Sequence, residues 1–189
     1  RINLGTLYPQ GALDVSRDIA LSFSMLSSDK SGHYGAGWSL SNTELDLATS
    51  SLTLITGERY QTQSLPSVGG TLVIKDCKLK DVVVKRIAES ELHVIYKEGT
   101  VEILGRPINP GPFKIMAIAF ENGERWNFRY LDGGPLKHIL DQNGQEMLVL
   151  TYIDGLLVMA DARIEGGRYA RTRINYGDAN NQRVGVTVP

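Results

Sequence analysis

Turn signals recur at nearly regular spacing, and this spacing limits the fold more than any other feature of the sequence. The signals are residue pairs such as Asn-Gly, Asp-Gly and Gly-Gly, which accept the positive φ angles that tight hairpin turns need. Their spacing of 10 to 12 residues leaves room for one short strand between successive turns. From Asn122 onward the signals are Asn122-Gly123, Asp132-Gly133-Gly134, Asn143-Gly144, Asp154-Gly155 and Gly166-Gly167. The series predicts an antiparallel meander of β-hairpins, with a repeat unit of about 22 residues.

Apolar alternation supports an all-β chain. Residues 19–25 place Ile19, Leu21, Phe23 and Met25 on one face of a predicted strand. Residues 81–87 (DVVVKRI) contain three consecutive valines, which favour a buried strand over a helix. Large aromatic side chains follow the repeat of the turns: Tyr130, Tyr152 and Tyr176 lie 22 and 24 residues apart. We expect one sheet ribbon, which could close on itself.

The hairpin around Asn122-Gly123 can be given a register. A two-residue turn sets Ala119 opposite Trp126, and further along the same face it sets Ile115 opposite Tyr130. Small residues then face large aromatic residues, which is a favourable cross-strand arrangement. A one-residue slip would move every side chain to the other face of the sheet.

Composition excludes several classes of partner. The 189 residues carry a formal net charge of -1 and no visible basic cluster, so nucleic acid is not an expected partner. No apolar run approaches the ~20 residues of a membrane span. The single cysteine, Cys77, provides no intrachain disulfide.

The segment 32–42 (GHYGAGWSLSN) invites a catalytic or phosphate-binding interpretation, but its spacing does not fit one. A dinucleotide fingerprint needs a third glycine and a following helix, and a nucleophile elbow needs a glycine two residues after the serine. Neither glycine is present. We therefore predict a structural turn, in which Gly35 or Gly37 has a backbone conformation that other residues tolerate poorly. Trp38 is predicted to be a largely buried anchor.

No other residues form a convincing chemical site. The three histidines, His33, His93 and His138, are far apart in the sequence and lack ligand spacing. Asp132, Asp141 and Asp154 each lie near a turn glycine, where aspartate accepts local backbone N–H bonds. The sequence predicts no catalytic residue, no metal ligand and no cofactor.

The segment 130–162 has the form Tyr-x-Asp-x-Gly-x-Leu-x-x-Ile-x-Asp-x-x-Gly, followed by a second Tyr-x-Asp-Gly at Tyr152, Asp154 and Gly155. This pattern resembles the YD repeats of Rhs proteins and of the B and C components of bacterial Tc toxin complexes. Residues 33–41 (HYGAGWSLS) resemble the region that precedes those repeats. The resemblance covers roughly residues 10–60 and 90–176 and divides the chain into an N-terminal portion, 1–90, and YD-like hairpins, 91–189. Only two good YD units are present, so the chain would be the leading edge of a longer array.

The resemblance implies a structural function. In that family the repeats form a β-sheet shell around a C-terminal toxin domain, and the family's self-cleavage motif matches no segment here. The implied partners are the remaining shell and its toxin domain. The implied location is outside the bacterial cell or on its surface, reached through a specialised delivery system.

Two other functions remain open from the residues alone. One is a secreted or cell-surface module that binds carbohydrate or protein through tyrosines beside Asp or Asn. The other is a hydrolase, which would need a pocket with two titratable groups of perturbed pKa. The segment 171–188 is predicted to be an open sheet edge, through which the fragment self-associates.

Overall fold

The computed structural model describes residues 1–10, 16–24, 32–75, 81–176 and 184–187, and these are almost entirely β-structure. Three strands near the N-terminus form a small sheet: β1 (Ile2–Leu7), β2 (Arg17–Phe23) and β3 (Trp38–Ser41). The remaining strands form a large antiparallel sheet. They are β4 (Glu44–Asp46), β5 (Ser51–Thr53), β6 (Arg59–Gln61), β7 (Val82–Ala88), β8 (Glu91–Tyr96), β9 (Val101–Gly105), β10 (Phe113–Ala119), β11 (Arg125–Tyr130), β12 (Leu136–Leu140), β13 (Glu146–Ile153), β14 (Leu156–Arg163), β15 (Tyr169–Tyr176) and β16 (Val184–Thr187). One 3-10 turn, η1 (Glu165–Gly167), joins β14 to β15.

The large sheet is the predicted meander from β7 to β16, with a branch at β10. Strand β10 pairs with β9 along one edge, while its other edge pairs first with β4 and then with β11. The strands β4, β5 and β6 therefore extend the sheet in a second direction. The described strands do not close into a barrel. The large sheet ends at β16, whereas the outer edges of β6 and β7 bond to the backbone of residues 69–75. The sequence allowed the sheet ribbon to close on itself, but the large sheet is not a closed barrel.

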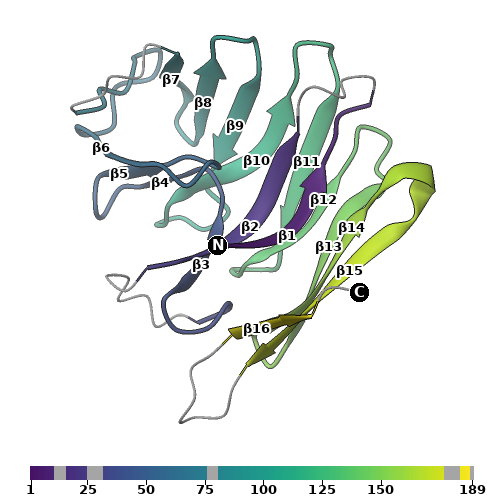
Figure 1. Ribbon diagram of the computed structural model, residues 1–189. Helices are drawn as coiled ribbons and strands as arrows, with labels where there is room; N and C mark the ends of the chain where they lie inside the picture. The colour runs from purple at the N-terminus through teal and green to yellow at the C-terminus, as the bar shows by residue number, and fades with distance from the viewer. Residues whose placement is uncertain (11–15, 25–31, 76–80, 177–183, 188–189) are drawn as a thin grey trace.

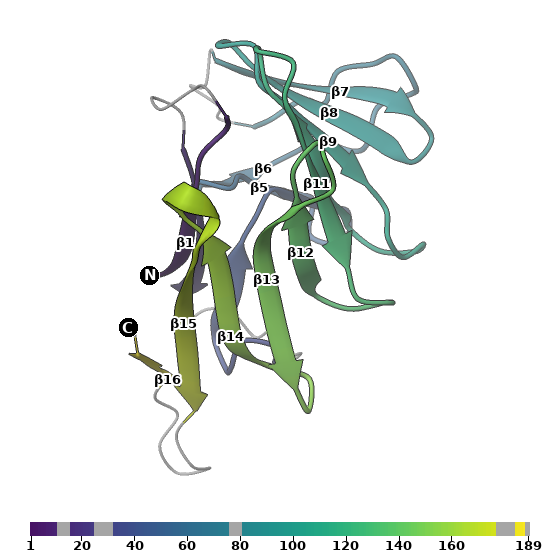
Figure 2. The same cartoon turned by 90° about the vertical axis from the view of Figure 1, so that its right-hand side faces the viewer.

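The small sheet lies across one face of the large sheet, as Figure 1 and the side view in Figure 2 show. Its inward side chains Leu4, Leu7, Ile19 and Leu21 are at most 1% exposed. Strand β1 approaches β14 so closely that a Cβ on Gly5 would lie 2.4 Å from the Cβ of Ala162. Any larger residue at position 5 would push the two sheets apart, so Gly5 sets their spacing.

The register predicted for the hairpin at Asn122-Gly123 is wrong by one residue. Ala119 pairs with Arg125, and Trp126 pairs with Ile118. The loop has three residues rather than two, because Phe120 and Glu124 close it through the bonds Phe120 N–H to Glu124 O and Gly123 N–H to Phe120 O. Gly123 has a φ of 86°, which is the left-handed position of a three-residue hairpin loop. Trp126 and Phe128 still face the core. The one-residue difference changes only which residues of β10 lie opposite those of β11, and the inward and outward alternation along β11 itself is as predicted.

The two-residue turn does occur at Asp154-Gly155, where Ile153 pairs with Leu156. Both turn residues have positive φ, 50° and 78°, as that turn type requires. The strand predicted at 81–87 is β7, but it is not a buried strand: Val84 is 1% exposed, whereas Val83 and Ile87 are 41% and 44% exposed. The boundary suggested at residue 90 falls inside the β7–β8 hairpin. The small sheet ends at Ser41, and the strands of the described residues after it belong to the large sheet.

The predicted alternation of the C-terminal segment is present in β15. Thr172 and Ile174 face inward, while Arg171 and Arg173 are exposed. Strand β16 pairs with β15 and forms the end of the large sheet. Met25, the last member of the face predicted for 19–25, lies outside the described residues, and Phe23 is 51% exposed.

Candidate functional site

The segment 32–37, which we name the glycine loop, leads into β3. Gly35 and Gly37 have φ angles of 90° and 76°, as the sequence predicted. At Gly37 a Cβ would also lie 2.7 Å from the Phe23 ring and 3.1 Å from the Ser24 carbonyl oxygen. Conformation and space together require glycine at position 37.

The glycine loop docks on the β13–β14 hairpin. His33 Nδ1 lies 2.8 Å from the Gly155 carbonyl oxygen, and the Leu157 N–H donates to the His33 carbonyl oxygen at 2.8 Å. Because a carbonyl oxygen only accepts, Nδ1 carries the proton in this contact. Beside these bonds the Tyr34 and Tyr152 hydroxyls approach to 3.4 Å. The loop thus attaches the small sheet to the second YD-like unit.

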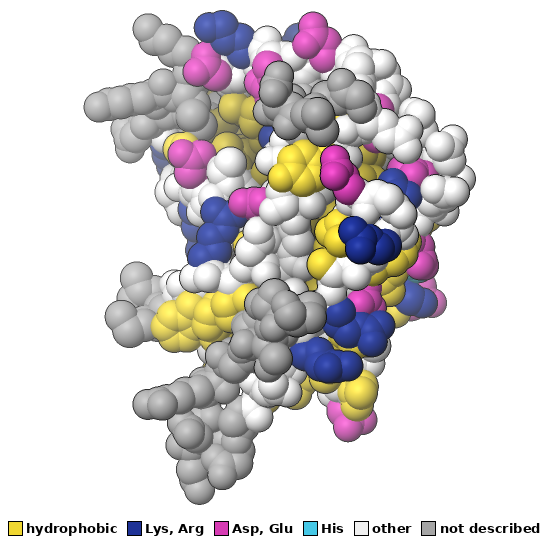
Figure 3. All heavy atoms as spheres, turned by 45° about the vertical axis from the view of Figure 1, so that its right-hand side comes forward, with side chains coloured by type: hydrophobic (Ala, Val, Ile, Leu, Met, Phe, Trp, Pro, Cys, Tyr) yellow, Lys and Arg dark blue, Asp and Glu magenta, His cyan; other side chains and the backbone are white. Residues whose placement is uncertain are grey.

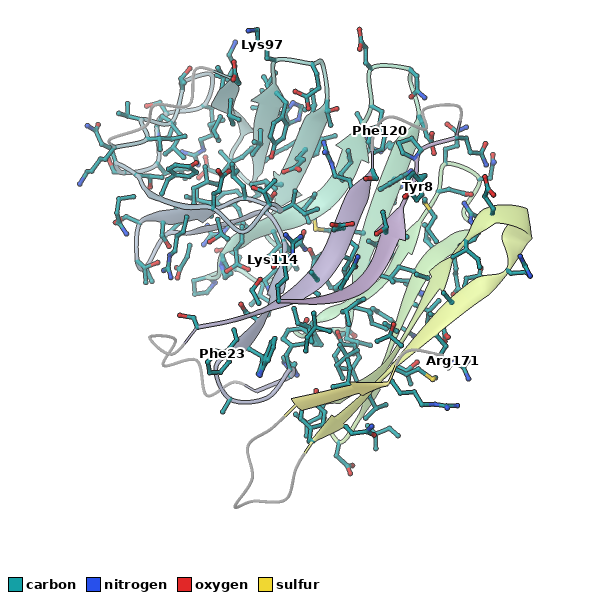
Figure 4. All side chains as sticks on the ribbon, in the orientation of Figure 1. Tyr8, Phe23, Lys97, Lys114, Phe120 and Arg171 are labelled. Atoms are coloured by element: carbon teal, nitrogen blue, oxygen red, sulfur yellow. The ribbon has the colours of Figure 1, made fainter. Side chains whose placement is uncertain are left out.

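Trp38 is partly buried and packs against the core cluster. It begins β3 and pairs with Phe23 at the rim of the small sheet, with ring centroids 5.4 Å apart. Figure 4 shows Phe23 at the end of this sheet opposite to Tyr8. The tryptophan that fills the core is Trp126, which is 0% exposed and donates its indole N–H to Glu124 at 3.0 Å.

Beside Trp38 lies a cavity of about 400 Å³, which we name the tyrosine pocket. Its walls come from the glycine loop and β3 on one side, and from β4, β10 and the β11–β12 turn on the other. The cavity is lined by the side chains of His33, Tyr34, Trp38, Ser39, Asn42, Glu44, Thr53, Lys114 and Tyr130, among others. Of the sequence-predicted residues, Trp38, Tyr130 and Gly133 meet here.

Three tyrosines of the repeat act in the same way on successive hairpins. Tyr130, Tyr152 and Tyr176 lie on β11, β13 and β15, and each donates its hydroxyl at 2.7 Å to a carbonyl oxygen of the preceding strand. The acceptors belong to Ile115, Leu136 and Leu157. The regular spacing of these tyrosines therefore marks a side-chain brace across each strand pair.

The tyrosines in and beside the pocket are buried phenols. Burial raises the pKa of Tyr34 to about 12, and burial likewise raises the pKa of Tyr130 and Tyr152 above the usual range of a phenol. A phenol with a raised pKa stays protonated near neutral pH, so these groups serve as hydrogen-bonding groups rather than as bases. Asn42 donates to the Tyr130 hydroxyl at 3.2 Å, and the Lys114 ammonium lies 5.6 Å from the Tyr130 ring centroid.

The other sequence-predicted residues lie elsewhere. Asn122, Gly123 and Trp126 are at the opposite end of β11 from the pocket. Asp132 is exposed in the β11–β12 turn. Gly155 contacts the glycine loop through His33, and neither Asp154 nor Gly155 lines the cavity.

Asp141 has the local role that the sequence suggested. Its Oδ1 accepts the N–H groups of Asn143 and Gln145 at 2.9 and 3.0 Å, and its Oδ2 accepts from Arg163 at 2.8 Å. Burial opposes the charge, but the guanidinium and the two backbone bonds outweigh it and hold the pKa of Asp141 below its usual value.

Sequence reasoning missed Tyr34, Asn42, Glu44 and Lys114. Tyr34 stands inside the glycine-rich motif, so its position next to Gly35 was an available signal. Glu44 and Lys114 are 70 residues apart and are brought together only by the pairing of β4 with β10. That pairing crosses the branch of the sheet, and a meander does not predict it.

Among the described residues, no group of three or more His, Cys, Asp or Glu side chains could hold a metal ion. Within the same ranges, no helix has the length and apolar character that a membrane crossing requires. A second hollow, of about 1070 Å³, lies between the end of β1 and the β14–β15 connection and includes Tyr8, Ile164 and Tyr169.

The fold and the site define an open, two-layer β-protein with a braced hairpin series. No protein-family model matches the chain, and no match was found among curated protein sequences. Among solved structures, the chain is similar to the N-terminal domain of the effector protein SpvB from Salmonella typhimurium strain LT2. The TM-score is 0.54 at 12% sequence identity, and the match covers 100% of this chain and 96% of that chain. At this identity the likeness shows a shared fold.

Proposed function

We propose that this chain is a non-catalytic structural module of a bacterial toxin-delivery protein, at the start of a shell of the Rhs or Tc type. The observation that carries the proposal is the hairpin series with its repeated tyrosine brace, which ends at β16 without closing. An open sheet end offers backbone N–H and C=O groups to a further strand. A continued array of YD hairpins would add at this end, and a C-terminal toxin domain would lie within the completed shell.

The fold likeness to a domain of an effector protein supports the same class of role. It is consistent with a protein that leaves the bacterial cell, or reaches its surface, through a specialised delivery system. The proposal assigns no enzymatic activity to this chain. The pocket tyrosines have perturbed pKa values, but the shift is upward and removes them as general bases at neutral pH.

The test begins with the product of the full-length gene. We expect a long run of further YD repeats after residue 189, followed by a C-terminal domain. Limited proteolysis of that product should leave the repeat region and the enclosed domain resistant, while the same C-terminal domain expressed alone is cleaved. A full-length product without further repeats, or with a C-terminal domain equally sensitive in both contexts, would overturn the proposal.

A further inference from the structure

The tyrosine pocket combines aromatic surface with polar side chains. Trp38 lies beside the cavity with its ring only partly buried, while Tyr34 and Tyr130 add two phenols. Ser39, Asn42 and Thr53 add uncharged hydrogen-bonding groups. A concave site of about 400 Å³ is at the lower end of the size range of small-molecule sites.

The charged groups of the pocket balance each other. Glu44 of β4 and Lys114 of β10 are direct partners across the antiparallel pair, so their side chains share one face of the sheet. Both line the cavity, which therefore carries one acidic and one basic side chain. This balance disfavours phosphate and other strongly charged ligands, which need an excess of the opposite charge. A neutral ligand with several hydroxyl groups can hydrogen-bond to both the Glu44 carboxylate and the Lys114 ammonium at once.

The walls are held in place by bonds to the backbone. Asn42 donates to the Tyr130 hydroxyl, which itself donates to the Ile115 carbonyl oxygen. On the other wall, His33 is fixed by its contact with Gly155, which leaves Nε2 as an acceptor in the neutral ring. A rigid site loses little conformational entropy on binding.

We propose that the tyrosine pocket binds a neutral saccharide unit. The partly exposed Trp38 ring stacks on the apolar face of the sugar ring, Lys114 donates to its hydroxyl oxygens, and Glu44 accepts from its hydroxyl groups. The cavity holds one or two sugar rings, such as the end of a glycan. This role goes beyond the structural function proposed above, and neither depends on the other.

Tryptophan fluorescence and calorimetry can test the site directly. The probes are glucose, galactose, mannose, N-acetylglucosamine and their disaccharides, with sodium phosphate as a charged comparison. Because Trp126 is 0% exposed, a change in emission on titration reports Trp38. We expect saturable binding of at least one neutral sugar and no effect of phosphate.

Variants then locate the site. Lys114→Met and Glu44→Gln should each weaken sugar binding by about tenfold or more, because each removes a charge-assisted hydrogen bond. Trp38→Phe keeps a smaller ring and should weaken it less. Lys97→Met is the matched control, since Lys97 is exposed far from the pocket (Figure 4). Melting curves identify any variant that fails to fold.

Three results would overturn the inference: no neutral sugar binds the folded protein at tens of millimolar, phosphate binds instead, or sugar binds equally well to the Lys114 and Glu44 variants.

Discussion

Glu102 is a carboxylic acid placed where the fold would be expected to put an apolar side chain. It faces inward from β9 beside Leu104 and is 0% exposed. Both of its oxygens, the Tyr96 hydroxyl and the Arg17 Nε lack a hydrogen-bond partner of standard geometry among the described residues. Burial raises the pKa of Glu102, an effect that Thr43, Arg17 and Tyr96 reduce and that Glu98 reinforces.

The raised pKa predicts a pH-dependent stability. The folded state holds the proton of Glu102 more tightly than the unfolded chain, so its contribution is complete below the unfolded pKa. That contribution is lost as pH rises through the folded pKa, by about 1.4 kcal/mol for each unit of pKa difference. Glu102→Gln should flatten this part of the profile, measured by urea unfolding at a series of pH values. The exposed Glu121→Gln is the control, and an unchanged slope in Glu102→Gln would contradict the prediction.

The two tryptophans should differ in their contribution to stability. Trp126 is fully buried, packs against Phe120 with centroids 4.7 Å apart and bonds to Glu124. Trp126→Ala should therefore cost about 3–5 kcal/mol. Trp38 is partly exposed at the pocket rim, and Trp38→Ala should cost roughly 1–2 kcal/mol. Thermal unfolding of the two variants measures the difference, and a larger loss for Trp38→Ala would show that it anchors the core after all.

At the scale of the elements, the tyrosine braces are equivalent parts of successive hairpins. Each hydroxyl donates to a carbonyl oxygen of the preceding strand at 2.7 Å. Tyr130→Phe, Tyr152→Phe and Tyr176→Phe each remove one such bond and should destabilise the chain by about 1 kcal/mol. Tyr130→Phe should cost most, because Asn42 also loses its partner. Chemical denaturation measures this order, and Tyr169→Phe, whose hydroxyl bond is exposed, is the comparison.

How far the sequence determines this fold differs between its elements. The meander could be predicted because each turn glycine is a local signal. The register at Asn122-Gly123 could not, since the same two residues fit a two-residue turn and a three-residue loop, and the choice rests on bonds made by Phe120 and Glu124. The inward position of Glu102 was hidden because Val101, Ile103 and Leu104 make both faces of β9 look apolar.

The candidate site was harder to predict from the sequence than the fold, because its residues come together only through long-range strand pairing. Trp38 and Tyr130 were visible as motif residues, but nothing local places them around one cavity. The branch at β10, which brings Lys114 beside Glu44, joins segments that no periodicity connects.

At the scale of the whole molecule, the surface is mixed in charge. Figure 3 shows acidic and basic side chains interspersed with apolar and uncharged ones on the face that it presents. On the outer side of β15, for example, Arg171 binds Asp161 at 2.7 Å. The formal net charge of the chain is only -1, so little overall repulsion opposes contact between copies.

We therefore expect the chain to self-associate through the sheet end at β16. Light scattering over a concentration series should show a rising mean mass. In neighbouring positions of a strand the N–H groups point to opposite edges, so only one of Gly185→Pro and Val186→Pro removes an outward-facing donor. That variant should associate less while keeping its melting temperature, and the other should lose the pairing of β16 with β15. A mass that stays monomeric throughout would contradict an open end.

The docking of the glycine loop has a consequence for how the protein is made. His33 and Gly155 are separated by 122 positions in the chain. A ribosome adding ~5–20 residues per second needs roughly 6–24 s to make the stretch between them. Throughout that interval β1 lacks β14, the strand against which Gly5 packs. The N-terminal strands are thus made well before the strand that completes their packing, so the small sheet can settle on the large one only after synthesis has passed β14.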